Sequence, residues 1–476
     1  MFDSIHEECG VFGIYDKHNT DVATSAYYAL YALQHRGQES CGIAVNDDGI
    51  ITAHRDMGLV PDVFTPRVLE ELGEGNIAVG HVRYSTTGCG NRVNAQPLMV
   101  KHIKGPMVVA HNGNLVNAAE LREQLELNGA IFHSTNDTEV IAYMITAERL
   151  KCGSIEEAVD KAMDSIKGAY SMLIMSPTKL IAVRDPNGFR PLCMGKLGES
   201  VIFASETCAL DSLGAKFFRD VEPGEVVVVD KDGIRSNKNH CGKYKSSMCV
   251  FEFVYFARPD SVIEGASVHI ARQRAGAYLA LEHPVQADVV IGVPDSGLDA
   301  AMGFAKQSGI PYDIGFIKNR YVGRTFIQPN QGQRTEAVKI KLNALKSTVN
   351  GKRVVMIDDS IVRGTTSARI VRLLREAGAT EVHVRISSPP FIDACYFGTD
   401  VDSKDKLIAN HKTVKEIAEM IGADSLGYLS VENIHKIAEG AKCTFCDGCF
   451  TGKYPVEPPQ STQKDKFELK ISEVSK

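Results

Sequence analysis

The residues best suited to chemistry lie in one segment, Val354–Ser367. Its first four residues are apolar and predict a buried strand, and Asp358 and Asp359 follow them directly. A loop of small residues comes next, and we expect Ser367 to cap a helix over 368–377. Ligands bind beyond strand ends in open α/β sheets, and a loop feeding a helix N-terminus suits a phosphate. Paired carboxylates suit ribose hydroxyls or Mg²⁺. The segment predicts a site for a sugar phosphate with a metal; an ordinary strand–loop–helix with acidic loop residues is the alternative.

Cys9 is a second candidate, because it stands directly before the strand-like run Val11–Tyr15. A cysteine nucleophile needs a base, and no local histidine signature surrounds this one. If residues 1–8 are removed, Cys9 carries a free α-amine, whose ordinary pKa of about 7.7–8.0 suits a base near neutral pH. The plain alternative is a buried core cysteine beside a strand.

Polar residues further along could complete a site around Cys9. Arg83 could clamp an α-carboxylate bidentately, and Asp137 could hold an α-ammonium group. The side-chain amide of Asn112 and the backbone N–H of Gly113 could form an oxyanion hole. Each residue taken alone could equally serve a turn or a helix cap. We expect most of them on loops, within the segments 34–40, 80–88 and 110–115.

The motifs Cys9–Gly13, His35–Glu39, His81–Tyr84 and His111–Gly113 together resemble the glutaminase domain of class II amidotransferases. The segment Val354–Ser367 resembles the phosphoribosylpyrophosphate (PRPP) loop of type I phosphoribosyltransferases. In combination the chain is similar, over roughly residues 5–455, to the glutamine PRPP amidotransferase family. The resemblance implies an α+β N-terminal-nucleophile hydrolase αββα sandwich followed by an α/β parallel-sheet phosphoribosyltransferase domain.

The resemblance also implies roles for individual residues. Cys9 is the nucleophile, Arg83 and Asp137 hold glutamine, Asn112 and Gly113 form the oxyanion hole, and residues 1–8 are a propeptide. Ser296, with Asp358 and Asp359, is associated with Mg²⁺, and whether the carboxylates contact metal or ribose stays open. A basic segment, 318–334, is expected to be a lid over PRPP rather than a solvated face. The residues expected to bind PRPP are Asp295, Asp358, Asp359, Arg363, Gly364, Thr365, Thr366 and Ser367.

Twelve cysteines are scattered along the chain, and three of them form two overlapping C-x₂-C spacings over Cys443–Cys449. In a reducing compartment such spacing suggests a metal, and four thiolates suit zinc or an iron–sulfur cluster equally well. Spacing alone could pair Cys443 with Cys446. Similarity to the iron–sulfur branch of the family implies a [4Fe–4S] cluster whose ligands are Cys249, Cys395, Cys446 and Cys449.

Composition and the pattern of predicted strands and helices indicate the class of protein and its domains. The 476 residues carry a net charge of −6, which does not favour nucleic-acid binding. No apolar run is long enough to span a bilayer and the N-terminus lacks a secretory pattern, so we expect a cytoplasmic protein that binds no membrane. Many short predicted strands indicate one domain in the first half of the chain, and alternating strands and helices indicate a second domain after it. The expected divisions are a propeptide 1–8, a glutaminase domain 9–235, a transferase domain with the cluster-binding segment 249–455, and a polar tail 456–476.

The expected reaction is the first committed step of purine synthesis. Glutamine, PRPP and water would give 5-phosphoribosylamine, glutamate and pyrophosphate, with ammonia passing along a closed path between two sites. A PRPP-binding regulator without catalysis is the alternative, and other glutamine amidotransferases are less favoured because they lack the Asp358-Asp359 loop. The family resemblance further implies purine nucleotides as feedback inhibitors and a homotetramer.

Overall fold

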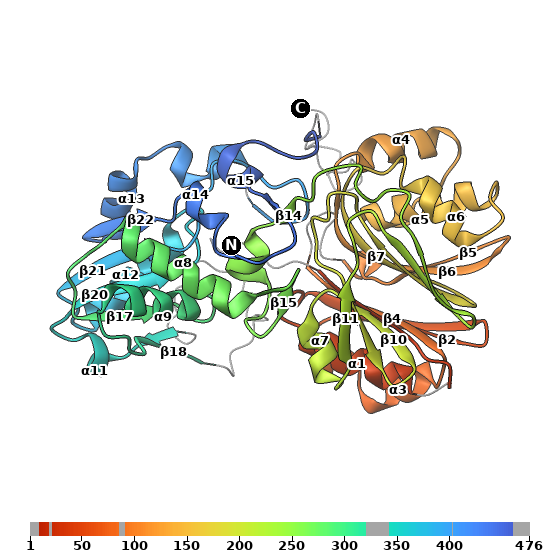
Figure 1. Cartoon of the computed structure of the whole chain (residues 1–476), viewed down its shortest axis with the longest axis horizontal. Helices are drawn as coiled ribbons and strands as arrows, with labels where there is room; N and C mark the ends of the chain where they lie inside the picture. Colours follow the sequence, from red (N-terminus) through yellow and green to blue (C-terminus); the bar gives the residue numbers. More distant parts are fainter. Residues whose placement is uncertain (1–8, 19–20, 85–90, 320–341, 402, 460–476) are drawn as a thin grey trace.

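The computed structural model describes residues 9–18, 21–84, 91–319, 342–401 and 403–459. These residues form two lobes that meet along the middle of the molecule (Figure 1). The first lobe contains β1 to β13 and the second contains the parallel sheet and the C-terminal segment. The expected propeptide, most of the expected lid and most of the polar tail lie outside the described residues.

Two antiparallel sheets stack face to face in the first lobe. Val11, Val79, Val108, Leu173 and Phe203 point from both sheets into one shared core and are almost completely buried. The sheet orders are β11-β9-β10-β1-β4-β2-β3 and β13-β12-β8-β7-β6-β5. The strands are β1 (Gly10–Tyr15), β2 (Ser40–Asp47), β3 (Ile50–Met57), β4 (Ile77–Arg83), β5 (Leu98–His102), β6 (Gly105–Leu115), β7 (Gly168–Ser176), β8 (Lys179–Arg184), β9 (Cys193–Leu197), β10 (Ser200–Ala204), β11 (Lys216–Asp220), β12 (Val226–Asp230) and β13 (Gly233–Asn237).

Helices cover the outer face of each sheet. Leu30 of α1 packs under the seven-stranded sheet, and Ile141 and Val159 of α5 and α6 pack on the six-stranded one. The first group is α1 (Val22–Ala32), α2 (Val60–Val63), α3 (Pro66–Leu72) and α7 (Thr207–Ser212), and the second is α4 (Ala118–Leu127), α5 (Asp137–Arg149) and α6 (Ile155–Ala162). The four layers form the expected αββα sandwich.

The second lobe is built on a parallel sheet in the order β17-β20-β21-β22. Alternate residues of β20 enter different cores, Val355 on the side of α8 and α9 and Met356 on the side of α12 and α13. Because both faces are covered, the strand reads as a continuous apolar run. The elements are β17 (Val289–Gly292), β20 (Arg353–Asp358), β21 (Glu381–Ile386), β22 (Ser425–Tyr428), α8 (Val268–Glu282), α9 (Gly297–Ser308), α12 (Thr365–Glu376) and α13 (Val414–Ile421).

Shorter elements tie the C-terminal segment to the region between the lobes. Residues 445–446 pair in parallel with residues 248–249, so that β23 and β14 lie side by side. The remaining elements are β14 (Met248–Cys249), a π-helical turn (Glu252–Phe256), β15 (Val262–Ile263), β16 (Ala266–Ser267), β18 (Phe316–Lys318), β19 (Leu342–Ala344), α11 (Lys346–Val349), α14 (Val431–Ile434), β23 (Phe445–Cys446), α15 (Gly448–Thr451), and the 3₁₀ turns Arg92–Asn94, Lys404–Lys406 and Ile408–Asn410.

Two local expectations are wrong. The helix after the carboxylate pair begins at Thr365, so Ser367 lies inside its first turn and is not the cap. Gly364, with a left-handed φ of 86°, takes the cap position, because glycine adopts that conformation without steric cost. The residues 81–83 and 111–113 lie within β4 and β6 rather than on loops, because these strands extend past their apolar runs into polar sequence.

Replacing Gly297 by alanine should destabilise the second lobe. A Cβ atom at Gly297 would lie 2.5 Å from the carbonyl oxygen of Ile357 at the end of β20. Overpacking of this kind costs about 1–3 kcal/mol, which should lower the midpoint of urea unfolding. Gly153→Ala is the control, because its Cβ would meet only the end of the Glu157 side chain at 3.6 Å. Equal midpoints for the two variants would contradict the crowding.

Candidate active sites

Cys9 lies at the entrance to β1 and is buried. Its Sγ is 3.5 Å from the carbonyl oxygen of Tyr84, just past the end of β4. Gly10 pairs with Val82 across the antiparallel strands, which brings Cys9 beside Arg83. The Nε of Arg36 donates to the Cys9 carbonyl oxygen at 3.0 Å. The main chain at Cys9 is therefore held by Arg36 and by the pairing of the neighbouring Gly10 with β4.

Asp137 and Arg83 supply opposite charges close to this position. Asn136 caps α5 by accepting from the backbone N–H of Thr138, and Asp137 is the first residue of the helix. The Asp137 carboxylate accepts from the backbone N–H of Leu115 at 3.0 Å and lies 3.4 Å from Nδ1 of His111. Burial by itself raises the pKa of Asp137, but His111, the Leu115 N–H and Arg83 outweigh it, and the net pKa is lowered. The group is therefore a stable buried anion.

Asn112 and Gly113 lie on β6, and the side chain of Asn112 keeps a hydrogen-bond donor unused. The side-chain Nδ2 of Asn112 is buried and has no hydrogen-bond partner among the described residues. A buried donor without a partner costs free energy, which fits a group kept for a ligand. Gly113 has a φ of 138°, and a Cβ there would lie 2.1 Å from the carbonyl oxygen of Ala169. Only glycine fits this position.

Together these residues can bind an amino acid and attack its side chain. A cation and an anion are available for the α-carboxylate and α-ammonium groups, a thiol for attack, and an amide donor for the oxyanion. The strands that carry them are joined where His81 Nε2 meets the His111 carbonyl oxygen at 3.0 Å. Burial lowers the pKa of His81 to about 3, although the His111 carbonyl opposes the shift, so His81 is neutral at physiological pH.

The second candidate site lies at the carboxyl edge of the parallel sheet. Gly292 of β17 pairs with Ile357 of β20, which aligns the loop after each strand. The Ser296 hydroxyl in the first loop donates to the Asp359 carboxylate in the second. Ser360 Oγ donates to the other carboxylate oxygen of Asp359 at 2.5 Å. The acidic pair and the loop containing Ser296 thus form one site.

Asp358 and Asp359 are both buried. Burial raises the pKa of Asp358 well above its usual range, and repulsion from Asp359 adds to the shift. Burial also raises the pKa of Asp359, against the opposing effects of Ser296, Ser360 and Arg272. A cation between these carboxylates would relieve both the desolvation and the repulsion.

The remaining residues expected to bind PRPP frame this edge. The segment Arg363–Gly364 leads into α12, and Thr365, Thr366 and the buried Ser367 form its first turn. A helix of twelve residues presents backbone N–H groups and a positive dipole end to an anion here. On the other side, Lys318 of β18 contacts the Asp295 carboxylate. Of the expected lid, only residues 318–319 are described.

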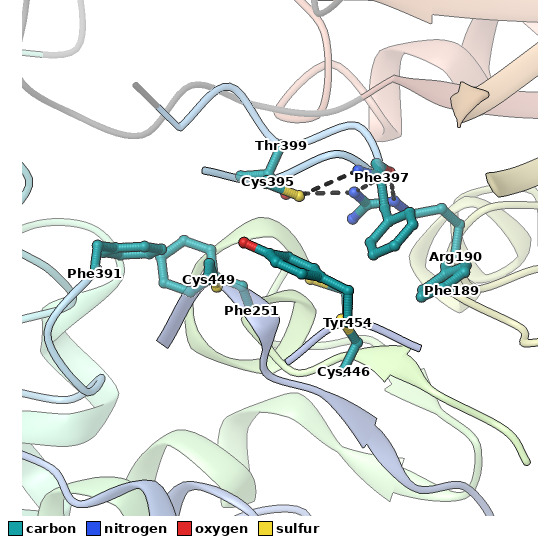
Figure 2. A pocket seen from close by; sticks show the side chains of 11 residues that line it. Phe189, Arg190, Phe251, Phe391, Cys395, Phe397, Thr399, Cys446, Cys449 and Tyr454 are labelled. Carbon is teal, nitrogen blue, oxygen red and sulfur yellow. Dashed lines mark hydrogen bonds between the residues drawn. The ribbon is translucent and has the colours of Figure 1, made fainter. Parts of the chain in front are cut away.

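Four cysteines line one cavity between the lobes (Figure 2). About 380 Å³ of the cavity is not filled by atoms, part of it open to solvent. Burial raises the pKa of Cys446 to about 12, and repulsion from three neighbouring thiolates adds to the rise at Cys449. Such thiols ionise only when a cation replaces their protons. The lining thiols are Cys249, Cys395, Cys446 and Cys449.

Cys443 stands apart from that set. It does not line the cavity, and its pKa is raised to about 12 by burial first and then by Glu264, with Arg184 opposing. Within the described ranges no three His, Cys, Asp or Glu side chains are arranged around a single metal ion. A cluster makes a different demand, because each thiolate binds its own iron and the sulfurs need not converge on one point.

Sequence reasoning missed the groups that fix these sites from behind. Arg36 lies within the motif His35–Glu39, but nothing in the sequence indicates that it contacts the Cys9 carbonyl. Glu206 and Glu252, which both pair with Arg36, carry no motif around them. A buried arginine is paired, so Arg36 could have prompted a search for its carboxylates, although not for which ones.

Comparisons with known proteins agree with both sites. Residues 81–212 match the glutamine amidotransferase domain, and residues 269–387 match the phosphoribosyl transferase domain. Amidophosphoribosyltransferase from Bacillus subtilis is 49% identical over 463 residues, covering 96% of each chain. The Methanocaldococcus jannaschii amidophosphoribosyltransferase is 51% identical, covering 94% of this chain and 98% of the relative. A solved structure of the B. subtilis glutamine PRPP amidotransferase with ADP and GMP superposes with a TM-score of 0.89 at 48% identity, over 96% of this chain and 99% of that one.

Fold and sites thus define a glutamine amidotransferase joined to a phosphoribosyltransferase. The chain belongs to the amidophosphoribosyltransferase family. It is an enzyme of the first step of purine biosynthesis, which uses the amide nitrogen of glutamine to convert PRPP to 5-phosphoribosylamine. Among the described residues, none of the helices has the length and apolar character needed to cross a membrane.

His81→Asn should remove part of the pH dependence of stability. The pKa of His81 is about 3 in the folded chain, below its ordinary 6.5, so the unfolded chain takes up this proton first as pH falls. His81 therefore contributes stability above pH 6.5 that is lost as the pH drops. Below pH 6 the free energy of unfolding should fall about 1.4 kcal/mol per pH unit more steeply in wild type than in His81→Asn. Urea unfolding at several pH values measures both slopes, and equal slopes would exclude a neutral, buried His81.

Proposed function

We propose that Cys9 is the nucleophile of the glutaminase reaction. Its freed α-amine would act as base, Arg83 and Asp137 would bind the two charged ends of glutamine, and Asn112 with Gly113 would stabilise the oxyanion. The observation that carries this assignment is the buried Nδ2 of Asn112, a donor with no partner among the described residues. An oxyanion hole is built from such donors, fixed before the substrate arrives.

The reaction at this site proceeds in two halves. Attack of the Cys9 thiolate on the γ-amide gives a tetrahedral oxyanion, whose collapse releases ammonia and leaves a γ-glutamyl thioester. Water then hydrolyses the thioester to glutamate and restores the thiol. The α-amine takes the thiol proton and delivers it to the leaving ammonia. Residues 1–8 must be removed first, and we propose that Cys9 itself cleaves them.

The carboxyl edge of the parallel sheet is proposed to bind PRPP. The loop and first turn Arg363–Ser367 would hold the 5′-phosphate, and Asp295 would lie in the pyrophosphate loop. Ser296, Asp358 and Asp359 would hold Mg²⁺, which when bound neutralises the pyrophosphate leaving group. The buried, mutually repelling carboxylates support this assignment, because their raised pKa values fall when a cation binds.

Ammonia must travel from Cys9 to the ribose of PRPP. In bulk water it would be protonated and diluted, so the junction between the lobes must exclude solvent. Direct contacts across the junction support a closed passage: the Asn114 side chain donates to the Tyr396 carbonyl oxygen at 2.9 Å, and a Cβ at Gly398 would lie 3.2 Å from the Gly113 carbonyl carbon. Both residues of the first lobe belong to the oxyanion strand β6.

A [4Fe–4S] cluster bound by Cys249, Cys395, Cys446 and Cys449 is proposed to fasten the C-terminal segment. The shared cavity and the mutual repulsion of the thiolates support a four-thiolate centre. When bound, the cluster would supply four irons that accept thiolate charge. Its proposed role is structural, since the proposed reaction transfers no electrons.

The wider setting is also proposed. ADP and GMP occupy a structural relative from B. subtilis, which supports purine nucleotides as feedback inhibitors here. We also propose a cytoplasmic homotetramer. Its domains are the glutaminase domain 9–235 and the transferase domain with cluster segment 249–455, followed by the polar tail 456–476.

Cys9→Ala should separate the two sites. With PRPP and Mg²⁺, wild type should release pyrophosphate with either glutamine or ammonium at high pH. The variant should lose more than about a thousandfold with glutamine, because no other group can form the thioester, yet keep its rate with ammonium. A variant that still uses glutamine would exclude Cys9 as the nucleophile.

Cys446→Ser and Cys443→Ser should differ in iron content. Anaerobically purified wild type should carry about four irons and four sulfides per chain, with visible absorbance. Cys446→Ser should lose most of both, whereas Cys443→Ser should match wild type because its thiol lies outside the cavity. Iron-free wild type, or equal loss in both variants, would refute the proposed ligand set.

A further inference from the structure

Glu252 is a buried carboxylate that the second lobe inserts behind the glutaminase site. It begins the π-helical turn Glu252–Phe256, whose Phe253 and Phe256 belong to the core of α8 and α9. Its two oxygens accept from both terminal nitrogens of Arg36, at 2.8 and 2.9 Å. A paired, planar contact of this kind fixes the orientation of a guanidinium as well as its position.

Arg36 passes that orientation to the nucleophile. Its third nitrogen, Nε, donates to the Cys9 carbonyl oxygen at 3.0 Å. Nη1 of Arg36, which donates to Glu252, also donates to Glu206 at 2.6 Å. All three side chains are wholly buried, so water cannot replace a lost contact. The Cys9 main chain is thus two contacts away from Glu252.

A second series of contacts leads from Glu252 to β6, which contains the proposed oxyanion residues. Arg190 Nη1 lies 3.4 Å from Glu252, and Arg190 Nη2 donates to the Phe397 carbonyl oxygen at 2.7 Å (Figure 2). The next residue, Gly398, packs so closely that a Cβ there would lie 3.2 Å from the Gly113 carbonyl carbon and from Arg190 Nη2. Glu252 therefore contacts two arginines, one that bonds to the Cys9 carbonyl and one that leads through Phe397 and Gly398 to Gly113.

We infer that Glu252 is a positioning residue for the glutaminase reaction, supplied by the transferase lobe. It fixes Arg36, and through it the carbonyl of Cys9, only when the two lobes are docked. The inference deepens the proposed function and rests on its assignment of Cys9 and Gly113. It makes the glutaminase site incomplete without the second lobe.

Because Glu252 is charged, its role should affect the pH dependence of Cys9 alkylation, which a role in packing alone would not. The ionisable groups of the network include Arg36, Arg190, Glu206, and two side chains that contact Glu206, His35 at 2.8 Å and Cys208 at 3.7 Å. Removing the Glu252 charge leaves Arg36 less compensated beside Cys9. A nearby uncompensated cation disfavours the protonated α-amine and favours the thiolate. Alkylation of Cys9 should then begin at lower pH.

The test uses the mature full-length enzyme carrying Glu252→Gln, with Glu264→Gln as matched control. Glu264 and Arg184 form another buried ion pair across the lobes, at 2.5 Å, without contact to Cys9. Glu252→Gln should lower kcat with glutamine about tenfold or more and leave KM near wild type, because Arg83 and Asp137 are untouched. Its rate with ammonium should stay near wild type, and the pH midpoint of inactivation by iodoacetamide should fall.

Glu252→Asp keeps the negative charge but shortens the side chain, so it tests the geometry of the contact alone. It also provides the test if Glu252→Gln fails to fold. It should lower kcat with glutamine but leave the iodoacetamide midpoint unchanged. Glu264→Gln should behave as wild type in both measurements. The inference is overturned if both Glu252 variants keep the wild-type kcat with glutamine, or if Glu264→Gln loses as much. Wild type without glutamine-dependent activity would instead count against the Cys9 assignment.

Discussion

A charge buried between two lobes is stable only when it is fully paired, and this constraint governs how the halves of the enzyme meet. Breaking a buried pair costs about 3–5 kcal/mol because the remaining charge is left uncompensated. Arg36 contacts carboxylates from both lobes, and Arg184 of the first lobe pairs with Glu264 of the second. A small rotation of one lobe would break several such contacts at once. Electrostatics therefore selects one docked arrangement where apolar packing alone would tolerate several.

The two sites hold their charged and polar groups in different ways. Around Cys9, strands β4 and β6 hold Arg83 and Asn112 in buried positions, where the proposed oxyanion would form. At the parallel-sheet edge, Asp358 and Asp359 are held close despite their mutual repulsion. In the proposed function, a ligand that brings a cation would relieve this repulsion.

Most of the architecture could be predicted from the sequence. Apolar runs such as Val354–Ile357 predict the strands, and the roles proposed for Cys9, Arg83 and Asp137 rest on residue type and on the family resemblance of their motifs. Local detail failed where polar residues continue a strand, as at Asn112, because alternation and propensity carry no signal for a strand that runs into a site. The cap at Gly364 was missed because serine is the commoner cap and the left-handed turn is visible only in the backbone.

Contacts between segments far apart in the chain could not be predicted from the sequence. Nothing local to Glu252 indicates that it meets Arg36, since 216 residues separate them. The choice between Cys443 and Cys446 is of the same kind, because both spacings are equivalent until the fold directs one thiol into the shared cavity and the other toward Glu264. Such pairings are properties of the topology and not of any window of sequence.

The close approach of Gly398 to Gly113 has a consequence for building chimeric synthases. An amidotransferase lobe grafted onto another acceptor enzyme would carry β6 with it, but not the main-chain segment 396–398 that packs against it. The recipient would have to provide glycine at that point, because Gly398 has a φ of 112° and a Cβ there would lie 3.2 Å from the Gly113 carbonyl carbon of β6. The first lobe is therefore not a fully independent module, and a graft should include the residues on both sides of this backbone contact.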